Sequence, residues 1–145
     1  MLRVVLAVLL AVALVGASLP AVERARVASS DAAVEREATA LATAVERACA
    51  DSDPVTPGGP GARRVVTLAL PARSWGHAGV ERVRVTPRGV RWRVRGGARH
   101  RLRFDGPAAL DRPIELRGAG RHRLRVACER RAGRAVAVVR RGTGL

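Results

Sequence analysis

The sequence contains no Lys, Asn, Gln or Tyr, and its only aromatic side chains are Trp75, Trp92 and Phe104. Proteins that bind single-stranded nucleic acid stack the bases on exposed aromatic rings. The alternating pattern around Trp92 and Phe104 places both rings in the core, and we expect Trp75, beside Gly76 in a loop, to pack over a core edge. Nucleic acid is therefore disfavoured as a partner, and only salt-dependent contact with phosphates remains available to it.

Motifs for catalysis are absent as well. No phosphate-binding loop or dinucleotide-binding motif occurs. Ser74 and His77 are close in sequence, but no Asp or Glu is convincingly placed to complete a catalytic triad with them. A triad is recognised by its geometry. His100 and His122, even with Cys128 nearby, lack the short spacing typical of metal ligands. We therefore expect no enzymatic activity, no cofactor, no metal and no small-molecule substrate.

The charge is strongly basic and unevenly distributed. The 145 residues carry a net charge of +15, from 27 basic residues, all Arg, and 12 acids. Residues 23–53 contain seven acids and four Arg, whereas the chain from residue 62 onward contains 22 Arg and five acids. Such asymmetry indicates an acidic segment and a basic body with different surroundings.

Residues 4–22 form a run without any charge, close to the ~20 residues that a helix needs to cross a hydrocarbon core. Arg3 before the run and the small residues Gly16 and Ala17 within it also fit a cleaved signal peptide. Apolar character continues through Leu19 and Val22, which favours a retained anchor. We predict a single-pass protein of the cell membrane, in contact with membrane lipid, with an extracellular C-terminal domain; cleavage is the alternative.

A helical pattern follows the apolar run. Ser30 or Asp31 would cap a new helix if Pro20 broke the first one, so a single kinked rod and two helices both fit. The apolar stripe can pack on sister helices or on the chain's own β domain. It recurs at a spacing of three and four, at Val27, Val34, Ala38, Leu41, Val45 and Ala48.

Three Pro and three Gly between residues 51 and 61 end this helical pattern. The predicted organisation is a transmembrane anchor or signal segment (1–22), a helical stalk (23–50), a Pro/Gly linker (51–61) and a basic β domain (62–145). Twofold alternation in the last region predicts strands over 65–70, 80–85, 90–95, 99–104, 121–128 and 134–140. With one helix and several short strands, the fold class is α+β, a helix followed by a small antiparallel β meander or sandwich.

Arginine alternates with apolar or small residues along these strands. If the apolar partners face the core, eleven Arg side chains point outward, and paired strands about 4.8 Å apart display them as rows. Facing like charges repel, so an anionic partner such as a surface glycan, an acidic protein or lipid head groups would explain the pattern; a solvated face is the alternative. The candidate anion-binding residues are Arg82, Arg84, Arg91, Arg93, Arg95, Arg99, Arg101, Arg103, Arg121, Arg123 and Arg125.

The two cysteines are Cys49, at the end of the helical pattern, and Cys128, in a late strand. An isolated pair in an exported chain suggests a disulfide that would tie the helix to the β domain. Two buried free thiols are the alternative.

The segments RVVLAVLLAVALVGASLPAVERARV (residues 3–27) and GARRVVTLALPARSWG (residues 61–76) resemble an uncharacterised haloarchaeal family of membrane-anchored proteins associated with type IV pilus and secretion genes. The resemblance implies a pilin-like role, with an apolar helix in a membrane or filament, a β head outside, and other pilus or secretion subunits as partners. The chain differs in its basic head and in having Met1, Leu2 and Arg3 lead directly into the apolar run.

Overall fold

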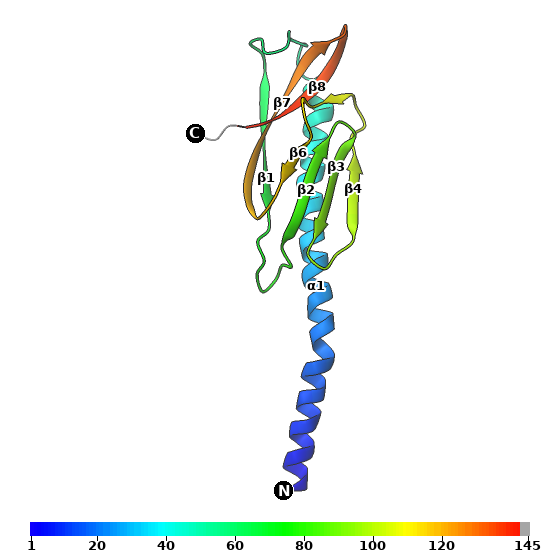
Figure 1. Cartoon of the computed structure of the whole chain (residues 1–145), viewed down its shortest axis with the longest axis vertical. Helices are drawn as coiled ribbons and strands as arrows, with labels where there is room; N and C mark the ends of the chain where they lie inside the picture. Colours follow the sequence, from blue (N-terminus) through cyan, green and yellow to red (C-terminus); the bar gives the residue numbers. More distant parts are fainter. Residues whose placement is uncertain (143–145) are drawn as a thin grey trace.

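A computed structural model describes residues 1–142, so the last three residues of the predicted 62–145 domain lie outside the described part. A long helix carries a β head at its C-terminal half, and its N-terminal half projects from that head (Figure 1). The elements are α1 (Leu2–Ala48), β1 (Arg63–Leu70), β2 (Val80–Thr86), β3 (Gly89–Val94), β4 (Arg99–Arg103), β5 (Ala108–Ala109), β6 (Ile114–Leu116), β7 (Gly120–Arg131) and β8 (Arg134–Arg141).

Helix α1 runs for 47 residues without interruption, with Pro20 inside it. Of the two arrangements that fit the sequence, the structure contains the single rod. Pro20 has no N–H to donate to the carbonyl of Gly16, but the helix continues on both sides of it. Ser30 and Asp31 therefore do not begin a new helix, and the Ser30 hydroxyl instead accepts hydrogen bonds from the backbone N–H groups of Ala78 and Gly79.

The C-terminal half of α1 belongs to the core of the head. Val34, Ala38, Leu41 and Val45 are at most 2% exposed, and Val27 packs partly buried against the same core. The helix contacts β1, β3, β4, β7 and β8 of its own chain. The apolar stripe thus packs on the chain's own β domain, and exposure changes within α1, near Arg26, rather than at the 51–61 segment.

The strands form two four-stranded sheets, with the orders β1-β7-β8-β5 and β4-β3-β2-β6. All pairings between these strands are antiparallel except that of β5 with β8. One hydrophobic core joins residues of both sheets to the helix. The α+β fold class is confirmed, and all six predicted strands are present; the sequence prediction missed the short strands β5 and β6.

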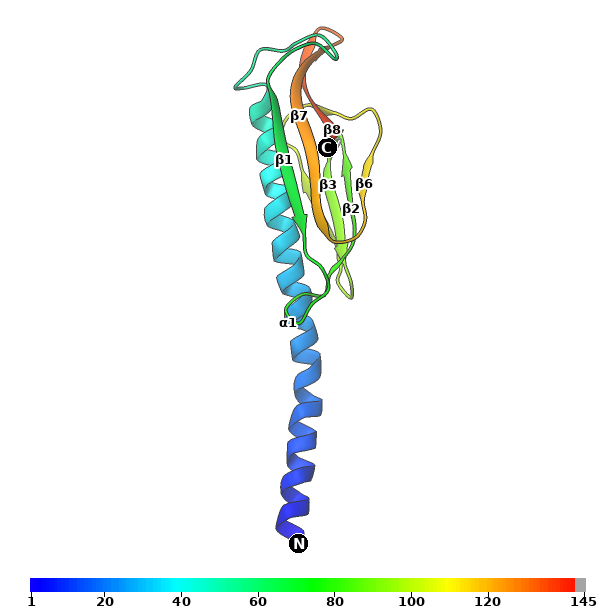
Figure 2. The same cartoon turned by 90° about the vertical axis from the view of Figure 1, so that its left-hand side faces the viewer.

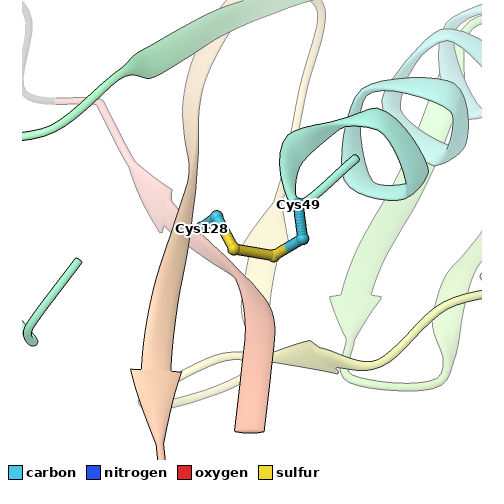
Figure 3. The surroundings of a disulfide bond; sticks show 2 residues. All are labelled: Cys49 and Cys128. Carbon is cyan, nitrogen blue, oxygen red and sulfur yellow. A yellow bond between two sulfur atoms is a disulfide. The ribbon is translucent and has the colours of Figure 1, made fainter. Parts of the chain in front are cut away.

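The 51–61 segment is fixed to the head rather than free. The carbonyl of Val55 accepts a hydrogen bond from the N–H of Arg130 at 2.8 Å, and the Val55 N–H donates to the carbonyl of Cys128. Beside this bridge, Cys49 and Cys128 form a disulfide between the end of α1 and β7 (Figure 3). Of the two states that the sequence left open for these cysteines, the structure contains the bonded one.

Candidate functional site

The sheet β4-β3-β2-β6 displays two rows of arginine on one face. The strands β2, β3 and β4 lie side by side (Figure 1), and their register places like charges opposite one another. In β2 and β3 the arginines alternate with buried residues, namely Val83, Val85, Val90, Trp92 and Val94, which turns these arginines outward. In β4, Arg99 and Arg101 are also exposed, and they flank His100 and the half-buried Leu102. These two sets are called the arginine rows: the first row consists of Arg84, Arg91 and Arg101, and the second row consists of Arg82, Arg93 and Arg99.

Acidic side chains compensate only part of this charge. Glu81 lies 3.4 Å from Arg93, and Glu115 lies 3.9 Å from Arg82. Within residues 1–142, the remaining four members, Arg84, Arg91, Arg99 and Arg101, make no salt bridge. Since facing like charges destabilise a sheet, the arginine rows carry an electrostatic cost that an anionic ligand would relieve.

The eleven arginines of the sequence prediction do not form a single surface. All eleven are exposed, as the alternation requires. However, Arg121, Arg123 and Arg125 belong to β7 in the other sheet, where they face Ala69, Thr67 and Val65 of β1. Arg103 pairs with Gly89, and Arg95 follows the end of β3, so both lie outside the rows.

A groove beside β6 and β7 is a second basic feature. Its volume is about 660 Å³, and its lining includes Arg117, Arg121, Arg123, Arg141 and the single acid Glu115. Glu115 accepts a hydrogen bond from Arg117 at 3.0 Å, which holds the pKa of the Glu115 carboxyl below its ordinary value. The groove is open and rich in cations, so it fits an anion better than an apolar molecule.

The histidines do not converge. His100 lies in β4, where it stacks on Trp92 with ring centroids 5.5 Å apart and lies 3.4 Å from Asp31. His122 lies in β7 of the other sheet, and Cys128 is bonded to Cys49. Among residues 1–142 no group of three or more His, Cys, Asp or Glu side chains is placed to hold a metal ion.

An ion network around the buried carboxylate of Glu129 joins β7 and β8. The Glu129 side chain is 3% exposed and accepts two hydrogen bonds from Arg140, at 2.5 and 3.2 Å, and one from Arg131 at 3.4 Å. Asp111 accepts from both arginines, at 2.9 Å from Arg131 and 3.3 Å from Arg140. Burial is the largest single influence and raises the pKa of Glu129, but the hydrogen bonds and charge of Arg140, together with hydrogen bonds from the Gly58 backbone and from Arg131, outweigh it, so the net pKa lies below the ordinary value.

The apolar half of α1 is the other candidate functional element. Residues 1–25 are exposed along their whole length, and none of the 18 most apolar consecutive residues is buried. Ser18, the one polar side chain in residues 4–22, donates to the carbonyl of Val15 at 2.8 Å. Its hydroxyl proton is therefore satisfied inside the helix, as a hydrocarbon environment requires. This helix is long and apolar enough to cross a membrane.

The fold and these two elements define a class: an α+β protein whose single helix is an exposed apolar rod at one end and part of the core of a basic β head at the other. The chain belongs to the family described as a domain of unknown function, DUF7311, whose model matches residues 1–142. No curated protein and no solved structure is significantly similar to it.

Proposed function

We propose that the protein is a non-enzymatic structural or accessory subunit of a pilus-type or secretion-type surface assembly. Residues 4–22 hold it in the cell membrane as a single-pass anchor, and the head is displayed outside. The observation that carries the proposal is the continuity of α1, which passes from a fully exposed apolar half into the core of the head without a break.

Continuity matters because it makes the head and the apolar segment one mechanical unit. A flexible tether would leave the head free to rotate, whereas here Leu41 and Val45 of the same helix are fixed in the core, which also contains residues of both sheets. An exposed apolar helix requires either lipid or other helices around it. Sister subunits can supply such helices, and each head then takes an orientation that its helix sets.

Cysteine cross-linking tests the assembly. Since the two native cysteines are bonded to each other, a cysteine added at any one of positions 8–14 is the only free thiol. We expect oxidation of the membranes to give dimers whose yield varies along these positions with the helical period, because one helix face meets a sister helix. A uniform yield, equal to that of Thr67→Cys on the exposed face of β1, indicates random collision and contradicts the proposal.

The arginine rows support a second candidate function, the capture of an anionic polymer such as a surface glycan or an acidic protein. The specific observation is that four of the six arginines make no salt bridge within residues 1–142, and of these four only Arg84 has an acid, Glu115, opposite it in the sheet. A flexible polyanion that lies across β2, β3 and β4 would neutralise them together. Such binding weakens with salt, because the released counterions drive it.

Heparin chromatography with matched variants tests this candidate. We expect Arg91→Gln/Arg101→Gln, which removes two unpaired members of the rows, to elute at clearly lower salt than the unmodified protein. Arg130→Gln/Arg134→Gln removes the same charge from exposed positions of the other sheet, outside the groove beside β6 and β7, and should change elution much less. Equal shifts for the two variants would show that only net charge matters, and they would remove the arginine rows as a site.

A further inference from the structure

The loop 71–79, between β1 and β2, presents the most exposed aromatic ring of the described chain. Trp75 is 85% exposed, so the expectation that it packs over a core edge is wrong. The loop lies against α1 just where the exposed half of the helix meets the head (Figure 2). A large apolar ring held in water at this position is unfavourable by itself, and a binding role would account for it.

Helix α1 holds the loop firmly at Arg26. The Arg26 guanidinium donates to the backbone carbonyls of Trp75 at 2.6 Å and of Ser74 at 2.8 Å, and it lies 5.6 Å from the centroid of the Trp75 ring. In return, the carbonyl of Arg26 accepts a hydrogen bond from the N–H of Ala78. Arg26 is thus bonded to the loop through both its side chain and its backbone carbonyl. The exposed Trp75 ring therefore lies in an ordered loop.

A second set of contacts fixes the same loop one helical turn further on. The fully buried Ser30 hydroxyl accepts from the N–H groups of Ala78 at 2.9 Å and Gly79 at 3.3 Å. Ser29 and His77 share a hydrogen bond of 3.2 Å. Ser29 and Ser30, together with Arg26 one turn earlier, therefore hold the loop at a defined height along α1.

That height corresponds to the edge of a membrane. Arg26 lies four residues beyond Val22, the last residue of the apolar run, which is about 6 Å along a helix axis. The head-group layer extends about 5–8 Å from the hydrocarbon core. If residues 4–22 span the core, Trp75 lies among the head groups, where tryptophan is enriched because its ring is apolar and its N–H is polar.

The β3–β4 turn reaches the same level and adds positive charge. Gly97 lies so close to α1 that a Cβ there would be 3.1 Å from Cγ1 of Val27. The N–H of Arg95 donates to the carbonyl of Gly79 at 3.0 Å, which joins the turn to the loop. The exposed arginines at this end of the head are Arg24, Arg73, Arg95 and Arg99.

We infer that loop 71–79 is an interfacial anchor, which inserts Trp75 into the head-group layer of the membrane that residues 4–22 span, while the arginines beside it bind anionic lipid head groups. The inference rests on the membrane anchoring in the proposed function. It adds a second attachment point, which fixes the tilt of the head relative to the membrane. The partner of this loop is lipid, because the Trp75 ring and the arginines lie at the same height along α1, just beyond the apolar run.

Tryptophan quenching by lipid tests the inference on the full chain. The protein is reconstituted into vesicles that contain anionic lipid brominated near the start of its acyl chains, and flotation establishes that it is bound. Bromine quenches tryptophan emission only at short range. We expect the unmodified protein to show a blue shift and a loss of emission that Trp75→Phe does not show, because the other ring, Trp92, is 6% exposed within the core.

The possible failures can be told apart. A chain that does not float with the vesicles contradicts the membrane anchor and with it the proposed function. A chain that floats but shows equal quenching with and without Trp75 overturns the interfacial loop alone. Quenching that disappears as the protein-to-lipid ratio rises assigns Trp75 to a neighbouring subunit instead of lipid. Equal quenching in zwitterionic and anionic vesicles removes the role of the arginines.

Discussion

Reduction of the Cys49–Cys128 disulfide is expected to lower the free energy of unfolding of the head by about 4 kcal/mol, since the bond closes a loop between residues separated by 79 positions. Domains of this size are stable by about 5–15 kcal/mol, so the loss is a large share of the total. The bond also ties the end of α1 to β7 (Figure 3). Denaturant unfolding of the full chain in detergent, with and without reductant, measures the effect.

The double variant Cys49→Ser/Cys128→Ser is the matched control. It should unfold at the lower denaturant concentration of the reduced protein and should not respond to reductant. If reductant leaves the midpoint of the unmodified protein unchanged while both thiols become reactive, the disulfide does not stabilise the fold.

Glu129→Gln is expected to destabilise the head by about 1–3 kcal/mol at neutral pH, because it weakens the hydrogen bonds that Arg131 and Arg140 donate to the buried carboxylate, while Asp111 still accepts from both arginines. Glu46→Gln removes an exposed carboxylate of α1 that makes no salt bridge within residues 1–142, and it should change little. Urea midpoints of the two variants, measured side by side, give the difference.

The deficit of Glu129→Gln should depend on pH. The folded-state pKa of Glu129 lies below its ordinary value of 4.5, so the carboxylate contributes its full stabilisation above that pH. The contribution is lost as the pH falls through the folded-state pKa. The gap between the variant and the unmodified protein should therefore narrow in acid; a gap that stays constant between pH 7 and strongly acidic pH would rule out an ionised Glu129 as its source.

The regular parts of the fold were predictable because each pattern had one physical meaning. Twofold periodicity predicted all six long strands, with Arg as the outward residue in β2, β3, β4 and part of β7, and the spacing of Val34, Ala38 and Leu41 predicted the buried helix face. The strands β5 and β6 have two and three residues, too few to establish a period. The division of the strands into two sheets depends on long-range pairing that no local pattern encodes.

The site was predictable only in part. Alternation correctly indicated which arginines point outward, but only the register showed that six of them form rows and that those of β7 lie on another sheet. Burial of Glu129 could not be foreseen, since its partners come from β8 and from the end of β7 itself. Trp75 was misplaced because its loop is held by Arg26, which precedes it by 49 positions.

These features combine into one account of the molecule. We propose that the apolar half of α1 crosses the membrane and that loop 71–79 holds the head at its surface; the same helix continues into the core that supports the arginine rows. Each part depends on the apolar segment remaining attached to the head in the mature protein. Cleavage near Gly16 and Ala17 would release the head and leave Trp75 without a membrane to contact.

Cell fractionation followed by mass spectrometry of the N-terminal peptide tests this dependence most directly. We predict that the mature chain is found in the membrane fraction, resists extraction with alkaline carbonate, and yields peptides that contain residues upstream of Ser18. A mature chain that begins at Ser18 and is recovered from the medium would contradict the account.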